Sequence, residues 1–234
     1  MVAPAMISRA SDAKAGRIES REVRIPPLGL AGTLQMPAAA KALVVFAHGS
    51  GSSRFSPRNT MVASALNAKG IATLLFDLLT LEEEDNRARV FDIPLLADRL
   101  TNVIRWIDQE AKLEPLPLGL FGASTGAAAA LVAAASLGDR VGAVVSRGGR
   151  PDLAGAALET VRAPTLLIVG GADSGVIELN EAALQRLRAP KALEIVPGAS
   201  HLFPEPGALE AVIAHATRWF LHHLGSSRAA ASAS

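Results

Sequence analysis

Apolar runs of strand length alternate with amphipathic segments of helix length along most of this chain. The apolar runs cover residues 42–47, 71–76, 116–121, 141–145, 165–169 and 193–196. The amphipathic segments cover residues 57–69, 93–111, 126–137, 154–160, 176–188 and 208–223. A strand that is apolar on both sides needs cover on both sides, as in parallel sheets. The alternation therefore predicts an α/β fold: a doubly wound, mostly parallel sheet with helices on both faces.

Two further extended segments, residues 22–25 and 28–35, precede this pattern and are separated by a pair of prolines. They predict an antiparallel hairpin at the edge of the sheet, which brings the expected total to about eight strands. With 234 residues, half of them apolar, the chain is long enough for one such domain and short for two. We expect this domain at residues 17–224, with flexible tails at 1–16 and 225–234.

Composition argues against several classes of partner. The 23 basic and 22 acidic residues are spread along the chain, so we expect no nucleic-acid partner. The chain has no cysteine and no histidine pair at metal-ligand spacing, so we expect neither metal nor cofactor. No apolar run is long enough to span a bilayer, and residues 1–16 lack the apolar core of a secretory signal. We expect a cytoplasmic protein without a membrane partner, a cleaved organelle-targeting segment being the alternative, and the oligomeric state stays open.

Ser124 is the candidate nucleophile. It is the centre of a Gly-x-Ser-x-Gly pattern between a predicted strand and an alanine-rich predicted helix. A sharp strand-to-helix turn lifts a serine hydroxyl clear of the sheet, and Gly122 and Gly126 omit the side chains that would block so tight a turn. Because the pattern fixes only three positions, its place between strand and helix is what makes it informative.

His201 and Asp173 are the candidate partners of this serine. A serine hydroxyl needs a base to take its proton, and His201 directly follows the last predicted strand. The imidazole in turn needs an acceptor that orients it, and Asp173 follows the neighbouring strand. Each residue has a plainer interpretation, since Asp173 could cap the next helix and His201 could be an ordinary loop residue. Because both residues follow successive strand ends, the catalytic interpretation is favoured for each of them.

The glycine-rich segment at residues 48–52 follows the first of the apolar runs and is the candidate oxyanion loop. We expect the backbone N–H groups of Ser50 and Thr125 to hold the oxyanion, with Gly51 as the alternate to Ser50. An ordinary glycine turn is the competing interpretation. We expect His48 to brace this loop through side-chain hydrogen bonds and not to act as the base.

These four motifs, taken with their chain order Ser124, Asp173, His201, resemble those of the α/β-hydrolase superfamily and, within it, the dienelactone hydrolase-like branch. The resemblance covers nearly all of residues 18–224 and implies an eight-stranded, mostly parallel sheet. Dienelactone hydrolases carry cysteine at the nucleophile position, so the serine here favours an ester over a lactone. The stretch after the run at 141–145 is short, which leaves no room for a large lid and suggests small acyl substrates.

Several arginines follow the predicted strand ends. We expect Arg54 or Arg147 to bind an anionic group of the substrate, because a guanidinium matches a carboxylate or phosphate at two points. Salt bridges to loop acids, such as Asp152 or the acidic run at 82–85, are the alternative. That run itself predicts a solvated loop, which could still border the site because it leaves the carboxyl end of a strand.

Together these observations predict a serine hydrolase that cleaves a small carboxylic ester through an acyl-enzyme. A thioesterase, a small-peptide hydrolase or an acyltransferase would use the same residues. Outside enzymes, the alternative is a binding module that keeps the fold without turnover.

Overall fold

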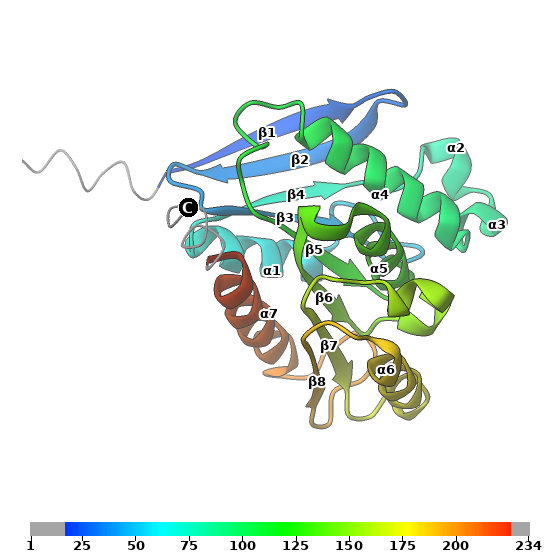
Figure 1. Cartoon of the computed structure of the whole chain (residues 1–234). Helices are drawn as coiled ribbons and strands as arrows, with labels where there is room; N and C mark the ends of the chain where they lie inside the picture. Colours follow the sequence, from blue (N-terminus) through cyan, green and yellow to red (C-terminus); the bar gives the residue numbers. More distant parts are fainter. Residues whose placement is uncertain (1–16, 226–234) are drawn as a thin grey trace, which may run out of the picture.

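The computed structural model describes residues 17–225 and contains an eight-stranded sheet in the order β1-β2-β4-β3-β5-β6-β7-β8 (Figure 1). The first two strands, β1 and β2, pair antiparallel with each other, β2 pairs antiparallel with β4, and the other neighbours are parallel. The strands are Ile18–Ile25, Leu30–Pro37, Ala42–Ala47, Ile71–Phe76, Leu118–Ala123, Val141–Arg147, Thr165–Gly170 and Lys191–Val196. The sequence prediction of a mostly parallel sheet with an antiparallel edge hairpin is confirmed.

Helices cover both faces of the sheet (Figure 1). Helices α1 (Pro57–Ala68) and α7 (Ala208–Gly225) pack on one face and enclose one hydrophobic core. The other face carries α4 (Ile93–Ile107), α5 (Thr125–Leu137), the 3-10 segment η2 (Pro151–Glu159) and α6 (Ser174–Arg186), which enclose a second core. Both faces of the central strands are therefore dry, which explains why β3, β4, β5 and β7 are buried along their whole length.

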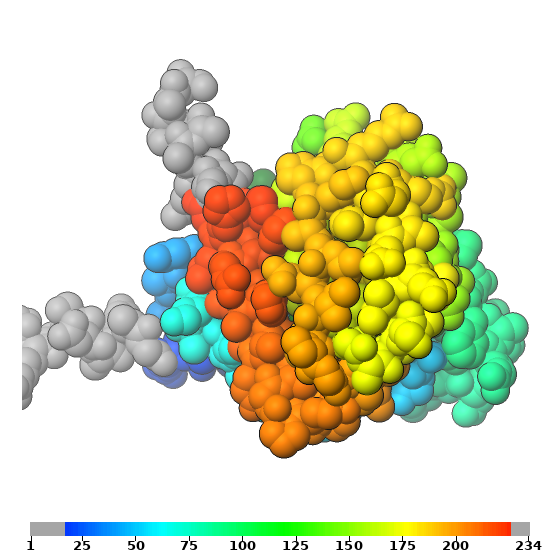
Figure 2. Space-filling view, turned by 90° about the horizontal axis from the view of Figure 1, so that it is seen from below, coloured from blue at the N-terminus to red at the C-terminus, as the bar shows by residue number. Residues whose placement is uncertain are grey.

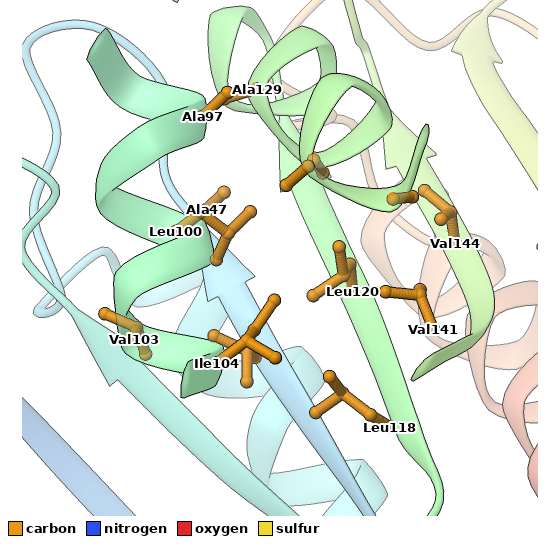
Figure 3. Close-up of a cluster of buried hydrophobic side chains, with 14 of the residues drawn as sticks. Ala47, Ala97, Leu100, Val103, Ile104, Leu118, Leu120, Ala129, Val141 and Val144 are labelled. Atoms are coloured by element: carbon orange, nitrogen blue, oxygen red, sulfur yellow. The ribbon is translucent and has the colours of Figure 1, made fainter. Parts of the chain in front are cut away.

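In the second core, apolar residues that recur at helical spacing in the sequence of α4 pack against the sheet (Figure 3). Leu100 and Ile104 of α4 are fully buried, one helical turn apart, and lie beside β5 and its side chain Leu120. Full burial of each such leucine or isoleucine contributes about 1.5–3 kcal/mol of transfer free energy. This packing fixes α4 against the sheet.

Helix α5 approaches the sheet unusually closely. A Cβ on Gly122 would overlap the backbone of Ala127, and one on Gly126 would overlap the carbonyl oxygens of Ala47 and His48. The alanine-rich sequence of α5 serves the same approach, because small side chains let the helix axis come near strands β3 and β5. Both glycines of the serine motif are thus needed because a side chain at either position would not fit between α5 and the sheet.

Two local predictions were wrong. The segment expected as a helix at 154–160 is the 3-10 segment η2, which kinks at Gly155 where φ is +54°. The acidic run expected as a solvated loop forms a short helix, α2 (Leu81–Glu84), and α3 (Arg87–Val90) follows it. Thr80 and Glu83 form a capping box at the start of α2, a pattern visible in the sequence.

The parallel strands all end at one edge of the sheet, where their loops meet. The loops after β7 and β8 are tied together by the Ala172 N–H, which donates to the Ala199 carbonyl at 2.9 Å. In Figure 2 the orange segment that follows β8 lies beside the yellow segment of α6. Three residues separate β6 from η2, in keeping with the expected lack of a large lid.

The tails predicted at 1–16 and 225–234 lie outside the described residues, except for Gly225, which is the last residue of α7.

We expect Gly126→Ala to lower the free energy of unfolding by about 3 kcal/mol, because the added methyl group meets backbone that cannot move aside. Gly175→Ala in α6 is the matched control, since a Cβ there meets nothing within 4 Å. That substitution should leave stability unchanged or raise it by about 0.4–1 kcal/mol. Urea unfolding followed by circular dichroism measures both. Equal stabilities of the two variants would contradict the close approach of α5.

Candidate active site

Ser124 occupies the turn between β5 and α5 in a strained backbone conformation. Its φ of +51° and ψ of −123° are rare for a residue with a side chain, and such strain persists only where the surroundings enforce it. Here its backbone is held on both sides: its N–H donates to the Arg147 carbonyl at 3.3 Å, and its carbonyl accepts from the Arg150 N–H at 3.1 Å. Ser124 is half-buried between buried neighbours, so the turn presents its side chain at the sheet edge.

Asp173 and His201 form a hydrogen-bonded pair at the same edge. The Nδ1 atom of His201 lies 2.7 Å from Oδ2 of Asp173. Asp173 stands at the N-cap position of α6 but its side chain makes no capping hydrogen bond, so the carboxylate orients the imidazole and does not cap the helix. With a proton on Nδ1 directed at the carboxylate, Nε2 of His201 is left with a lone pair. This is the arrangement required of a general base.

Ser124 and His201 each lie against one of two consecutive residues, Arg147 and Gly148. Arg147 accepts from the Ser124 N–H, while a Cβ on Gly148 would lie 2.9 Å from the carbonyl oxygen of His201 and 3.6 Å from its Nδ1. Within residues 17–225, no hydrogen bond joins the Ser124 hydroxyl to His201. In an unliganded site such bonds are often long and tighten when substrate binds.

His48 braces the candidate oxyanion loop, as expected from the sequence. Its Nε2 accepts from the Leu78 N–H at 3.1 Å, and its Nδ1 lies 3.0 Å from the Gly49 carbonyl. Because Nε2 is an acceptor, Nδ1 carries the proton and the ring is neutral. Burial lowers the pKa of His48, which favours this neutral form. The histidine thereby joins the loop after β3 to the chain after β4.

The two residues expected to hold an oxyanion contact each other. The Ser50 N–H donates to the Thr125 hydroxyl at 3.1 Å, so this predicted donor already has a partner in the structure. The Thr125 N–H is at the first position of α5, where a helix offers no partner for it. Gly49 lies against the nucleophile, since a Cβ there would be 2.9 Å from the Cβ of Ser124. The loop, Ser124 and Thr125 thus form one contiguous surface.

A cavity of about 620 Å³ opens beside this surface. Ser50 and Thr125 belong to its wall, together with Arg58 at the start of α1. Glu84 and Asp85 from the acidic run also line this cavity, so the run does border the site although it is not a plain loop.

The two arginines expected to bind substrate have different surroundings. Arg54 forms ion pairs with Asp77 and, at 3.5 Å, with Glu22, so its guanidinium is neutralised. These ion pairs are the alternative to substrate binding that the sequence left open, and they tie the oxyanion loop to β1 and to the end of β4. Arg147 is buried and has no such carboxylate partner within the described range.

Asn59 is a residue beside this site that the sequence prediction missed. Asn59 is 2% exposed, and its Oδ1 lies 3.4 Å from Nη2 of Arg147. Asn59 lies in the first turn of helix α1, far from β6 in the chain, and no sequence motif signals its contact with Arg147.

Residues 17–225 contain no group of three or more histidine, cysteine or acidic side chains suited to a metal ion. No helix in this range combines the length and apolar character needed to cross a membrane.

Comparison with known proteins connects this geometry to a family. A family model described as an alpha/beta hydrolase domain matches residues 40–215. The crystal structure of a dienelactone hydrolase from Anabaena variabilis is 54% identical, with a TM-score of 0.85 over 90% of this chain and 99% of that chain. Est1E from Butyrivibrio proteoclasticus shares the fold at 16% identity, with a TM-score of 0.74 over 88% of this chain and 99% of that chain.

A curated Mycobacterium tuberculosis protein named "Putative phosphoribosyl transferase" is 57% identical over 208 residues, which are 89% of this chain and 47% of that protein. The chain therefore spans about half the length of the curated relatives it matches.

We expect acid to weaken the fold partly through His48. Since its pKa in the folded protein is lowered below the ordinary value of 6.5, the unfolded chain takes up the proton more readily. The stability contributed by neutral His48 is thus present above pH 6.5 and is lost as the pH falls. His48→Gln keeps one donor and one acceptor at this position but does not titrate. Between pH 7.5 and pH 5.5, the melting temperature of this variant should therefore fall less than that of the unmodified protein. Identical falls would show that His48 does not titrate with unfolding.

Proposed function

The chain belongs to the α/β-hydrolase superfamily, in its dienelactone hydrolase-like branch, and from this premise we propose that it is a serine hydrolase that cleaves a small carboxylic ester through an acyl-enzyme. The observation that carries the proposal is the 2.7 Å contact between Asp173 and His201 at the sheet edge where Ser124 stands in its strained turn.

In the proposed reaction His201 takes the proton of the Ser124 hydroxyl through Nε2, and the serine oxygen attacks the ester carbonyl. The imidazolium then gives this proton to the departing alcohol, which leaves an acyl group on Ser124. Water repeats the sequence and releases the acid. Asp173 stays ionised throughout, holds the proton of Nδ1 in place and stabilises the imidazolium.

The oxyanion that forms on the carbonyl needs donors that are already in position. The Thr125 N–H and the Ser50 N–H are the proposed pair, with the Gly51 N–H as alternate. Ser50 would exchange its present acceptor, the Thr125 hydroxyl, for the substrate oxygen. Before substrate arrives, the hydrogen bond to Thr125 keeps the Ser50 N–H in a fixed orientation. Donors that are already oriented are the condition for electrostatic stabilisation of the oxyanion.

The name of the Mycobacterium tuberculosis relatives does not suit these residues. A serine backed by a histidine and a carboxylate activates an oxygen nucleophile for attack on an acyl carbon. The matched region is 47% of those proteins, so a transferase activity in them does not have to belong to this part.

The first test is covalent labelling. A fluorophosphonate probe should label the protein and should spare Ser124→Ala, because the probe reacts with an activated serine oxygen. Labelling is read by mass spectrometry together with turnover of short-chain aryl esters, thioesters and amides, whose relative rates separate the three hydrolase classes. A folded protein that is neither labelled nor active would favour the binding-module alternative.

The second test removes the orienting charge. Asp173→Asn should lower kcat for an aryl ester by roughly 1,000- to 10,000-fold, because an amide that donates to Nδ1 would hold the ring in the wrong tautomer. Asp152→Asn is the matched control: its carboxylate accepts two hydrogen bonds from Arg150 at the same sheet edge, with no contact to His201. A similar kcat in both variants would contradict the role of Asp173.

A further inference from the structure

Helix α6 buries a polar side chain on the face that packs against the rest of the molecule. Within α6, which lies wholly in the described range, the buried residues are Asn180 and Ala183. Asn180 is 0% exposed, although asparagine is mostly found at protein surfaces. Burial of an amide is unfavourable unless hydrogen bonds offset it, and leucine would serve packing alone better. The hydrogen bonds of Asn180 therefore indicate its role.

The amide of Asn180 joins α6 to residues 147–150 at the end of β6, here called the β6 loop. Its Nδ2 atom donates to the Gly149 carbonyl at 3.0 Å and to the Val176 carbonyl, one helical turn earlier, at 2.8 Å. Both partners are acceptors, so the nitrogen of the amide must face them and the oxygen cannot. The bond to Gly149 links residues 31 positions apart and so fixes one segment of the chain against another.

The β6 loop holds the backbone of Ser124 on both sides. The Arg147 carbonyl accepts from the Ser124 N–H at 3.3 Å, and the Arg150 N–H donates to the Ser124 carbonyl at 3.1 Å. Gly148 lies against His201, since a Cβ on Gly148 would be 2.9 Å from the carbonyl oxygen of that histidine. The position of the β6 loop therefore sets where the proposed nucleophile and the proposed base lie.

Two of the four residues of the β6 loop are glycine, so the loop needs support from outside. Gly148 has a φ of +50°, in the region that glycine adopts without cost. A Cβ on Gly149 would overlap Oγ of Ser146 and lie 2.6 Å from Cβ of Ala127, so no side chain fits there. A glycine pair gains no rigidity from its own side chains. A hydrogen bond from a packed helix supplies the missing restraint.

The same helix carries the proposed orienting acid. Asp173 is the N-cap residue of α6, and its Oδ2 lies 2.7 Å from Nδ1 of His201. Asn180 follows two turns later, about 10 Å along the helix axis at a rise of about 1.5 Å per residue. One rigid element thus holds the carboxylate at its first residue and, through Asn180, the β6 loop.

We propose that Asn180 is a positioning residue of the candidate active site. Its hydrogen bond to the Gly149 carbonyl holds the β6 loop, and the loop in turn keeps the Ser124 turn and His201 in place relative to Asp173. Asn180 acts through Gly149 and does not touch the reacting atoms. The inference rests on the proposed function for the reaction that Asn180 supports, whereas the anchoring of the loop can be measured without a substrate.

The experiment replaces Asn180 in three ways. Asn180→Asp keeps the shape but puts an oxygen where the nitrogen faces two carbonyls, and Asn180→Leu keeps a similar volume without a polar group. Asn180→Ser keeps a hydroxyl that can donate to the Val176 carbonyl within the helix but is too short to reach Gly149.

In all three variants kcat for a short-chain aryl ester should fall by about 10- to 100-fold with KM changed less than about threefold, because a displacement of about 1 Å at the reacting atoms costs up to about 100-fold. The rate of fluorophosphonate labelling should fall by a similar factor, since the probe reacts with the same serine oxygen. Both rates are measured at a temperature at which circular dichroism shows every variant folded.

Asn67 provides the matched control. It is a buried asparagine of α1 whose Nδ2 also makes two hydrogen bonds, to the Ile71 carbonyl at 2.9 Å and to the Thr73 hydroxyl at 3.1 Å. These partners lie in the first half of β4, away from the carboxyl edge of the sheet where Ser124 stands. The same three substitutions at Asn67 should lower the melting temperature but leave kcat and the labelling rate unchanged.

A purely structural role of Asn180 predicts that its variants behave like those of Asn67, with a lower melting temperature and an unchanged kcat. That result overturns the proposal. An unchanged kcat in Asn180→Ser alone also overturns it, because this variant loses the bond to Gly149 and keeps the bond within the helix. Asn180→Ser decides if the other two variants do not fold.

Hydrogen exchange separates failure of this proposal from failure of the proposed function. If the unmodified protein is neither labelled nor active, the amide hydrogens of Ser124 and the β6 loop should still exchange about 2- to 10-fold faster in the Asn180 variants, the range of one lost neutral hydrogen bond. In the Asn67 variants these amides should exchange as in the unmodified protein. Unchanged exchange in the β6 loop of the Asn180 variants overturns the anchoring, whatever the activity.

Discussion

The close approach of helix α5 to strands β3 and β5 is the constraint on which the site depends. No side chain fits at Gly122 or Gly126, because backbone atoms already occupy the space that a Cβ would take. With helix and strand this near, the single residue between them must turn sharply, and Ser124 takes a φ of +51°. Strain at the candidate nucleophile is therefore a consequence of packing, and the tertiary structure sustains it.

A second close approach sets the distance between the proposed base and its carboxylate. A Cβ on Gly170 would overlap the carbonyl oxygen of Ala199, so the loops after β7 and β8 can touch only because that residue is glycine. Contact between these loops brings Asp173 to His201. His48 fixes a third loop in a similar way, by hydrogen bonds instead of by packing. Three segments distant in the chain thus hold a common geometry.

The arginines at the sheet edge divide into those with a carboxylate partner and those without one. Arg54 joins its loop to Asp77 and Glu22, whereas Arg150 pairs with Asp152 two residues further along the chain. Arg58 and Arg147 form no ion pair within residues 17–225, and the Nε atom of each is buried without a hydrogen-bond partner.

The sequence by itself determined the order and type of most elements, because apolar periodicity follows directly from which faces a strand or helix must bury. It also placed Ser124, Asp173 and His201 at strand ends, since parallel strands share one carboxyl edge. Only the tertiary structure decided which arginine is neutralised and that Ser50 donates to Thr125, because such pairings depend on distances between loops that no local pattern records. Local sequence patterns determine which secondary-structure elements form, whereas tertiary packing determines which side chains from distant segments come into contact.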